Sequence, residues 1–321
     1  MLKLKKTTVI DKDPDYYLSF PDIVRSVKNP DRFFMAYRSG NGHHPTTSKL
    51  ILKKSENKGR SWKTIQEFIL NIEDHKYVWN CPRLSYINNI LYIVCDAKSG
   101  TFERQSHFKT MFLTSTTEGD FFRIADTPMP GMVPDKIIKF QDKYYCANHK
   151  IKNERNELIQ LVSWSKDGKL WYDTNIMAHD EKCQFCEASV VNMNDTYMIA
   201  YLRDNSGHKR KIYTVKSTNG IEWSEPFELP LFGQRVTALQ HTKNSVVGAF
   251  RNTDNINVSL FEHYVDTDKI VDVLDVEEDY KINQYNYGYT GLEDNDDEYL
   301  MPYYIKKKAD NPYIKLAFIK K

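Results

Sequence analysis

One short phrase occurs four times along this chain of 321 residues. Each copy begins with a serine, passes through a glycine and closes on a tryptophan or a phenylalanine, and the copies lie at 55–62, 115–122, 165–171 and 217–223. Their first serines recur every 50 to 60 residues. A period of this size is the signature of a repeat architecture, in which one supersecondary unit is used several times.

The chemistry of the phrase predicts a hairpin turn. An Asp or Asn side chain, as at Asn57 and Asp167, can accept hydrogen bonds from backbone N–H groups, and glycine adopts a positive φ at little cost. One such turn would be ordinary loop chemistry, but four in period indicate a repeated β-hairpin. The phrases resemble the Asp-boxes of sialidases and related β-propellers, a resemblance that implies turns on the outer rim, away from any active site.

Between the phrases, runs in which apolar and polar residues alternate predict strands. These strands fall into six groups, which begin near residues 20, 83, 136, 188, 236 and 290. A propeller blade has four antiparallel strands, and propellers have about four to eight blades. We therefore predict an all-β fold, a six-bladed β-propeller in one domain that spans residues 1–321. The last group has only three strands, at 290–293, 298–304 and 313–319, and the segment 5–10 is predicted to supply the fourth and close the ring.

Composition supports strands and excludes some partners. The chain has 21 tyrosines and 13% aromatic residues, and aromatic residues favour β-strands. The formal net charge is +2, which does not indicate a nucleic-acid partner. No apolar run approaches the length of about 20 residues that spans a membrane. The first ten residues lack the apolar core of a signal peptide, which predicts a cytoplasmic protein, or a virion-associated one if a phage encodes it.

The five cysteines predict free thiols and no metal. An odd number of cysteines without a signal peptide favours reduced side chains over disulfides. The pair Cys183 and Cys186 has the spacing of a zinc ligand pair but lacks a second pair. The acidic stretch 293–298 lacks the glycine and the ligand spacing of a calcium loop, so we interpret it as a solvated turn. No metal and no cofactor are predicted, and the oligomeric state is left open.

Ionisable residues gather where a propeller would open onto one face. In such a ring the starts of the innermost strands and the ends of the second strands lie at the same face. The predicted innermost starts are Ser19, Arg83, Asp135, Glu187, Arg235 and Tyr289, and the second-strand ends are Arg38, Asp96, Lys150, Arg203, Arg251 and Lys306. Guanidinium groups match carboxylates with two hydrogen bonds, so this set favours an anionic or polyhydroxylated ligand.

Several of these residues lie in segments that resemble the substrate site of sialidases. The segments 186–191 and 200–207 are similar to those that hold the essential Glu and the second of three substrate-binding arginines, which implies Glu187 and Arg203. The segment 233–236 resembles the one with the third arginine, with Arg235 and Arg251 competing for the role. The segment 288–292 looks like the one with the nucleophile, which implies Tyr289, while Tyr285 and Tyr287 remain alternatives.

The resemblance implies glycoside hydrolysis by double displacement, with a tyrosine as nucleophile. A sialic acid has a carboxylate beside its anomeric carbon, so a neutral phenol attacks with less repulsion than an anionic side chain. Tyrosine ionises near pH 10 and needs a neighbouring base, a role that Glu187 would serve. Arg203 and Arg235 would hold the substrate carboxylate, with Asp135 and Arg251 as further binding candidates.

Two departures from the sialidase pattern concern the first group of strands. Ser19 occupies the place of the first arginine of the triad, and a serine cannot bind a carboxylate with two hydrogen bonds. The loop 38–45 also lacks the expected acid/base Asp. His43 or His44 is a candidate proton donor because histidine titrates near neutral pH, although an adjacent His pair is also typical of an exposed turn. Arg38 is a candidate replacement for the lost arginine.

Three functions are consistent with the sequence. The first is a sialidase-like hydrolase that acts on an acidic or unusual glycan. The second is a carbohydrate-binding propeller without catalysis, such as a phage tail or cell-surface receptor-binding protein. In both, the partner is a glycan or glycoconjugate. The third is a protein-interaction scaffold, which would require a large exposed apolar patch.

Overall fold

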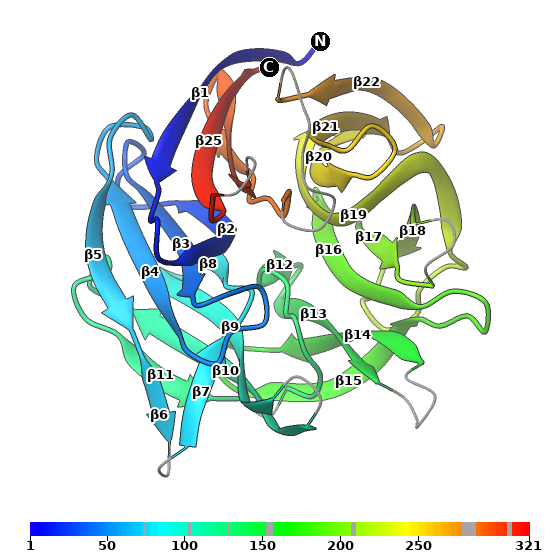
Figure 1. Ribbon diagram of the computed structural model, residues 1–321. Coiled ribbons are helices and arrows are strands. Elements are labelled where there is room, and N and C mark those ends of the chain that lie inside the picture. Colours follow the sequence, from blue (N-terminus) through cyan, green and yellow to red (C-terminus); the bar gives the residue numbers. More distant parts are fainter. Residues whose placement is uncertain are drawn as a thin grey trace. The chain divides into compact units, whose positions relative to one another are not determined.

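The computed structural model describes residues 1–72, 75–101, 104–127, 129–151, 157–206, 210–277, 287–306 and 310–321. Regular structure in these ranges consists of β-strands in antiparallel pairs, and no helix occurs among them, so the all-β prediction is confirmed (Figure 1). Contacts divide the chain into two compact units, unit 1 with residues 1–127 and 278–321 and unit 2 with residues 128–277. The prediction that residues 1–321 form one domain stays a prediction.

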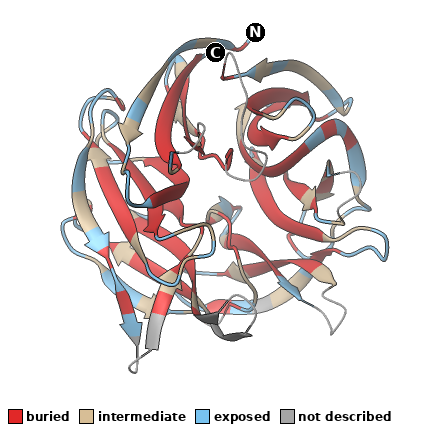
Figure 2. Cartoon of the chain, viewed as in Figure 1, coloured by how far each residue is buried: buried red, intermediate tan, exposed pale blue. Residues whose placement is uncertain are grey.

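The first sheet of unit 1 is a simple meander. It contains, in spatial order, β2 (Tyr17–Arg25), β3 (Phe33–Gly40), β4 (Ser48–Ser55) and β5 (Lys63–Phe68). Every residue of β3 is buried, whereas most of β5 is partly or fully exposed (Figure 2). The inner strands are therefore covered over most of their length, and the outer strand has the largest share of exposed residues.

The second sheet of unit 1 contains a hairpin that the sequence did not predict. Its expected strands are β8 (Arg83–Ile87), β9 (Ile90–Thr101), β10 (Arg104–Ser115) and β11 (Arg123–Asp126). The additional strands are β6 (Leu70–Ile72) and β7 (His75–Trp79), and β7 pairs with β9. Trp79 anchors this hairpin, because it is fully buried and its indole nitrogen donates to the Phe68 carbonyl at 3.0 Å.

The last sheet of unit 1 combines the two ends of the chain. Its order is β1 (Lys3–Asp11), β25 (Tyr313–Lys320), β24 (Glu298–Ile305) and β23 (Glu293–Asn295). β1 pairs antiparallel with β25 from Lys3 opposite Lys320 to Asp11 opposite Ile314, and Figure 1 shows the two strands side by side. The prediction that the N-terminal strand completes the last group of strands is confirmed.

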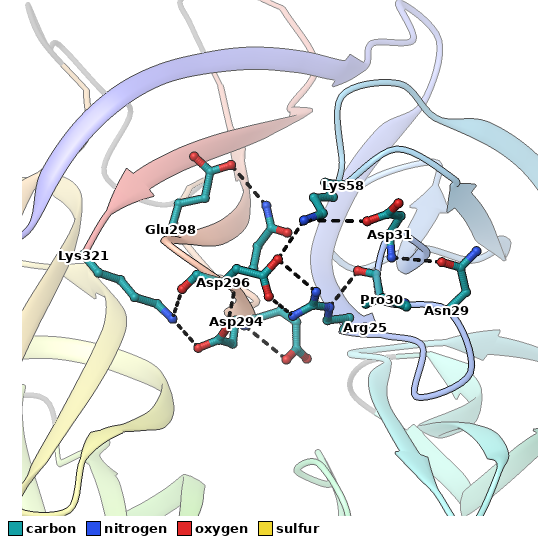
Figure 3. A network of polar contacts seen from close by, with 11 residues as sticks. Arg25, Asn29, Pro30, Asp31, Lys58, Asp294, Asp296, Glu298 and Lys321 are labelled. Carbon is teal, nitrogen blue, oxygen red and sulfur yellow. Dashed lines mark hydrogen bonds and ion pairs between the residues drawn. The ribbon is translucent and has the colours of Figure 1, made fainter.

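The acidic stretch 293–298 is the β23–β24 hairpin, as the sequence predicted. Both oxygens of its Asp296 carboxylate accept hydrogen bonds from the Arg25 guanidinium, at 2.9 and 3.1 Å. One of them also accepts a hydrogen bond from the Lys58 ammonium at 2.8 Å (Figure 3). Hydrogen bonds from Arg25 and Lys58 lower the Asp296 pKa to about 2. The acidic turn therefore joins the last sheet to β2 and to the first repeated turn, within unit 1. In the described part of the chain, no group of His, Cys, Asp and Glu is arranged to hold a metal ion.

Unit 2 has two sheets in its described residues. One contains β12 (Ile138–Phe140), β13 (Lys143–Ile151), β14 (Leu158–Ser165) and β15 (Trp171–Ala178). The other runs in order through β16 (Phe185–Met193), β17 (Tyr197–Asp204), β18 (Lys211–Ser217), β19 (Phe227–Thr242), β20 (Ser245–Asn252), β21 (Asn257–Tyr264) and β22 (Lys269–Asp275).

The long strand β19 differs from the prediction. We expected two separate strands, near 226–229 and 236–240, as the end of one group and the start of the next. Instead β19 pairs with β18 through its first half and with β20 through its second, so the two groups share one seven-stranded sheet. The described strands thus form five sheets, and the number of six blades stays a prediction.

The four repeated phrases form the predicted hairpin turns. They connect β4 to β5, β10 to β11, β14 to β15, and β18 to β19. In each turn the first serine hydroxyl accepts the glycine N–H, at 3.0, 3.0, 2.9 and 2.9 Å in chain order. The four glycines, Gly59, Gly119, Gly168 and Gly220, have φ between 73° and 89°. The serine and the glycine therefore fix the same backbone path four times.

The third turn supports a stability prediction. Asp167 Oδ1 accepts the N–H groups of Lys169 and Leu170 at 2.8 and 2.9 Å. We expect Asp167→Ala to lower the free energy of unfolding by about 1 kcal/mol, the usual effect of losing a side-chain cap, because both donors must turn to water. Urea denaturation measures this loss, and ligand binding per folded molecule should not change. The control is Asp142→Ala, an exposed aspartate in the β12–β13 turn. If Asp167→Ala and Asp142→Ala lose the same free energy of unfolding, Asp167 does not stabilise the turn as a cap.

Candidate active site

Two strands of unit 2, β16 and β19, contain the same irregularity. Between the pairs Cys186–Arg203 and Ser189–Tyr201, β16 has one residue more than β17. Between the pairs Gln234–Arg251 and Thr237–Ala249, β19 has one residue more than β20. Each extra residue forms a β-bulge, which redirects side chains and is common beside active sites.

The first bulge residue has a positive φ in both strands, at 51° for Glu187 and 46° for Arg235. Side chains other than glycine adopt this conformation at a cost of about 1–3 kcal/mol, and such strain is concentrated at functional sites. Unit 1 repeats the arrangement between the pairs Ser19–Arg38 and Asp22–Ala36, where Phe20 has φ of 58°.

The three bulges define a repeat that the sequence analysis missed. The bulge residues are Phe20, Glu187 and Arg235, and an arginine of the next strand pairs with the residue before each of them: Arg38, Arg203 and Arg251. Register between strands cannot be derived from a local pattern, so the bulges, and with them Phe20 as the counterpart of Glu187 and Arg235, could not be predicted. The available signal was an arginine at the end of the second strand in each of these three groups.

In unit 2 the structure brings Glu187 and Arg203 together. Arg203 Nη1 donates to Glu187 Oε2 at 2.8 Å, and Arg203 Nη2 donates to Asn205 Oδ1 at 2.7 Å. Burial alone would raise the pKa of Glu187, but the charges of Arg203 and Arg235 outweigh it and lower the pKa to about 2. The carboxylate is therefore ionised at neutral pH, beside two guanidinium groups.

The other predicted residues of unit 2 surround this pair or support it. Arg235 is fully buried, and its Nη2 donates to the Pro134 carbonyl at 3.4 Å. Arg251 Nη1 donates to Gln234 Oε1 at 3.0 Å. Both arginines are thus held by neighbouring polar groups, while the charge of Arg235 also acts on Glu187.

Asp135 and Cys186 serve the framework of this site. Asp135 Oδ2 accepts the Val190 N–H of β16 at 3.0 Å, so this carboxylate holds the strand that carries Glu187. A role of Asp135 in substrate binding stays a prediction. Burial raises the pKa of Cys186 to about 12, so this thiol remains protonated and is no competing nucleophile.

In unit 1, Tyr289 belongs to a group of aromatic side chains. Its ring lies 5.2 Å from the Phe20 ring and 6.5 Å from the Tyr304 ring, between centroids. Phe20 and Tyr304 lie 5.4 Å apart, so the three rings pack on one another. Of the two alternative tyrosines, Tyr287 is buried, and Tyr285 lies outside the described residues.

Arg38 and His43 lie against the same aromatic group. The Arg38 guanidinium stacks on the Phe20 ring at 4.6 Å from its centroid. Its Nη2 donates to the His43 carbonyl at 2.9 Å, and the Tyr17 hydroxyl bonds to His43 Nδ1 at 3.0 Å. Burial lowers the pKa of Arg38, and burial together with the charges of Arg38 and Lys98 lowers that of His44. Unit 1 thus holds Tyr289, Phe20, Arg38 and His43 in one group.

Ser19, at the position where the sialidase resemblance expects an arginine, is uncharged, and its assignment to that position stays a prediction. It is fully buried and pairs across the sheet with Arg38. The position expected for an arginine therefore offers no charged group, and Arg38, the residue opposite, supplies the guanidinium beside Phe20.

The acidity of Glu187 gives a pH prediction. Its pKa is about 2 in the folded chain and about 4.5 when unperturbed. A lowered pKa adds stability above pH 4.5 that is lost as the pH falls toward 2, here about 2–3 kcal/mol. Urea denaturation between pH 6 and pH 2 should show a steeper loss in the wild type than in Glu187→Gln. The control Glu262→Gln removes a buried glutamate near His241 and should keep the wild-type slope. If Glu187→Gln loses unfolding free energy between pH 6 and pH 2 as steeply as the wild type, Glu187 does not have the lowered pKa.

Comparisons with known proteins identify the fold. No protein-family profile matches the chain, and no curated protein is significantly similar to it in sequence. A protein of unknown function from Dyadobacter fermentans is similar in structure, with 17% identity, a TM-score of 0.83 and 99% of both chains covered. An α-L-arabinofuranosidase from Fusarium graminearum, solved with an iminosugar inhibitor, matches with 11% identity and a TM-score of 0.76, over 99% of this chain and 98% of that one.

A sialidase from Trypanosoma rangeli, solved with the inhibitor DANA, is a third neighbour. It has 13% identity and a TM-score of 0.68, and the match covers 94% of this chain. The chain spans about half of that sialidase's length, with 55% covered. The likeness shows that the chain has the fold of the sialidase-like β-propeller glycosidases, which confirms the predicted resemblance at the level of the fold. The described part of the chain contains no helix with the length and hydropathy of a membrane span.

Proposed function

We propose that this chain is a sialidase-like glycoside hydrolase, folded as one six-bladed β-propeller, that acts on a glycan with an acidic or otherwise unusual sugar. The observation that carries the proposal is the Glu187 cluster of unit 2. An ionised carboxylate lies on a strained bulge, bonded to Arg203 at 2.8 Å and under the charge of Arg235. The fold shared with sialidases and an arabinofuranosidase supports the reaction class.

The arginines favour an anionic sugar. Arg203 and Arg235 both act on Glu187 through their charges, and Arg251 lies at the paired position beside the second bulge. Guanidinium groups bind carboxylates with two parallel hydrogen bonds, so this group of arginines suits a substrate carboxylate. The proposal gives Arg203 and Arg235 this role, with Arg38, Arg251 and Asp135 as further contacts to the glycan.

The proposed mechanism is a double displacement at the anomeric carbon. The Tyr289 oxygen forms a bond to that carbon as the bond to the leaving oxygen breaks, and Glu187 takes the phenolic proton. His43 donates a proton to the leaving oxygen. In the second displacement the water oxygen bonds to the anomeric carbon as the bond to Tyr289 breaks, His43 accepts the water proton, and Glu187 returns its proton to the Tyr289 oxygen. Glu187 is ionised and can accept a proton, but Arg203 and Arg235, which lower its pKa to about 2, make it a weak base. The bond from Tyr17 to His43 supports an oriented imidazole.

Hydrolysis of a panel of 4-methylumbelliferyl glycosides tests the proposal. The panel contains sialic acid, uronic acids, L-arabinofuranose and common neutral hexoses. We expect release of the fluorophore from an acidic member at a rate well above that of the neutral hexosides. If no member is hydrolysed at any pH between 4 and 8, the chain is not a glycosidase of this class.

A non-catalytic carbohydrate-binding protein is the second candidate, and the structure of unit 1 favours it. Ser19 is buried where a triad arginine would stand, and Arg38 is engaged by the His43 carbonyl and the Phe20 ring. Such a protein would bind anionic glycans without turnover, as a phage tail or cell-surface receptor-binding protein does. If the wild type binds sugars of the panel and hydrolyses none of them, this second function is the correct one.

A further inference from the structure

Unit 1 contains a pocket of about 390 Å³ on the outer part of its first sheet. Its lining comes from the turn before β2, the end of β3, the start of β4 with the preceding loop, the end of β5, the residue after it, and the hairpin β6–β7. Its lining includes Tyr16, Thr47, Lys49, Glu67, Ile69 and Tyr77. None of the residues proposed for hydrolysis is among those that line it. A volume of this size is in the range of small-molecule sites.

The pocket has an apolar platform in contact with water. Tyr16 is 43% exposed and Ile69 is 69% exposed, although both are large apolar side chains. The Lys49 ammonium lies 5.9 Å from the centre of the Tyr16 ring. An exposed aromatic ring beside polar groups suits a ligand with one apolar face and a polar edge. The C–H face and the hydroxyl edge of a sugar ring have this character.

The polar groups of the pocket favour a neutral ligand. Lys49 Nζ and Glu67 Oε2 form an ion pair at 2.8 Å, so their charges cancel. The hydroxyl of Thr47 and the amide of Asn71 add donors and acceptors at the rim. Donors and acceptors placed next to one another match the vicinal hydroxyls of a saccharide, while an anionic sugar would find no unpaired cation here.

The pocket is held in shape before any ligand binds. Asn41 Nδ2 donates to Thr46 Oγ1 at 2.8 Å, and Asn41 Oδ1 accepts the Thr46 N–H at 2.9 Å, so one side chain clamps the loop. Ser48 Oγ accepts the Trp79 N–H at 2.7 Å, which ties the start of β4 to the end of β7. A preformed site loses less entropy on binding. The hairpin β6–β7, an addition to the four-strand plan, forms one wall.

We propose that this pocket binds a neutral saccharide unit of the glycan, at a site separate from the hydrolytic residues. The class of ligand, a glycan, follows from the proposed function, on which this inference rests. The location of the site follows from the pocket. Tyr16 adjoins Tyr17, which bonds to His43, and the loop 41–47 carries both His43 and the clamped Thr46. One glycan chain that reached both places would gain affinity through its second contact.

Titration of the full chain with neutral oligosaccharides tests the pocket. Binding is measured from the changes in its amide and methyl NMR chemical shifts. The probes are arabino-, xylo-, cello- and galacto-oligosaccharides. We expect one series to bind the wild type, and Tyr16→Ala to weaken that binding about tenfold by removing the platform. The control Tyr264→Ala removes a tyrosine on β21 that is 42% exposed, and should bind as the wild type does. Equal thermal unfolding of both variants would show that they are folded.

The same titration separates this inference from the proposed function. Tyr289→Phe should lose hydrolysis and retain saccharide binding at the pocket. If hydrolysis fails in the wild type but Tyr16-dependent binding persists, the pocket stands and the hydrolase does not. The pocket proposal is wrong if no series binds at millimolar concentration, or if Tyr16→Ala binds as tightly as the wild type.

Discussion

Tyr289→Phe is expected to reduce glycoside hydrolysis by at least about a thousandfold, because the substitution removes the oxygen that we propose as the nucleophile and no other heavy atom. The ring that packs on Phe20 and Tyr304 is retained, so the fold should be intact. The measurement is kcat/KM on the glycoside that the wild type hydrolyses fastest, with the thermal unfolding midpoint determined on the same samples.

Tyr287→Phe is the matched control for this experiment. Tyr287 lies two residues earlier and is buried, and its substitution should leave kcat/KM within a few-fold of the wild type. Full activity in Tyr289→Phe would show that the nucleophile is another group. Loss of activity in Tyr287→Phe alone would transfer the role to that tyrosine.

Arg203→Ala is expected to have the second large effect, on both stability and binding. It leaves the Glu187 carboxylate in a mostly buried place without the donor at 2.8 Å, since the two side chains are only 15% and 10% exposed. Breaking a buried ion pair in this way costs about 3 kcal/mol. Affinity for anionic sugars should fall about a hundredfold because a bidentate contact is lost. Urea denaturation and titration calorimetry measure the two effects.

A double variant separates the two effects of Arg203. Arg203→Ala combined with Glu187→Gln should recover part of the lost stability, because the uncompensated charge is gone, and should not recover the affinity for anionic sugars. Arg123→Ala, which removes an exposed arginine of β11, is the control and should change neither quantity. Unchanged affinity in Arg203→Ala would place the anionic sugar elsewhere.

Local chemistry explains why much of the fold was predictable from the sequence. The four turns are set by a serine and a glycine within a few residues, and the hydrogen bonds that they form are local. The pairing of β1 with β25 followed from counting strands, since the last group lacked one. Strand β19 was not predicted as one element, because Pro230 and Gly233, residue types that usually interrupt a strand, lie between its halves.

Two contacting residues of the candidate site could be indicated from the sequence, but their geometry could not. Sequence alone placed Glu187 and Arg203 at the ends of neighbouring strands, and the structure joins them in one ion pair. The bulges at Phe20, Glu187 and Arg235 depend on register between strands, which only tertiary pairing fixes. The hairpin β6–β7 is too short for a periodic signal, and its position depends on the burial of Trp79.

Mass spectrometry of the protein, quenched during incubation with its best glycoside, tests the central claim most directly. A retaining mechanism with a tyrosine nucleophile predicts a glycosyl adduct of one sugar on the peptide that contains Tyr289, and no adduct in Tyr289→Phe. Turnover with an adduct on another residue, or turnover with none in rapidly quenched samples, would contradict the proposed mechanism.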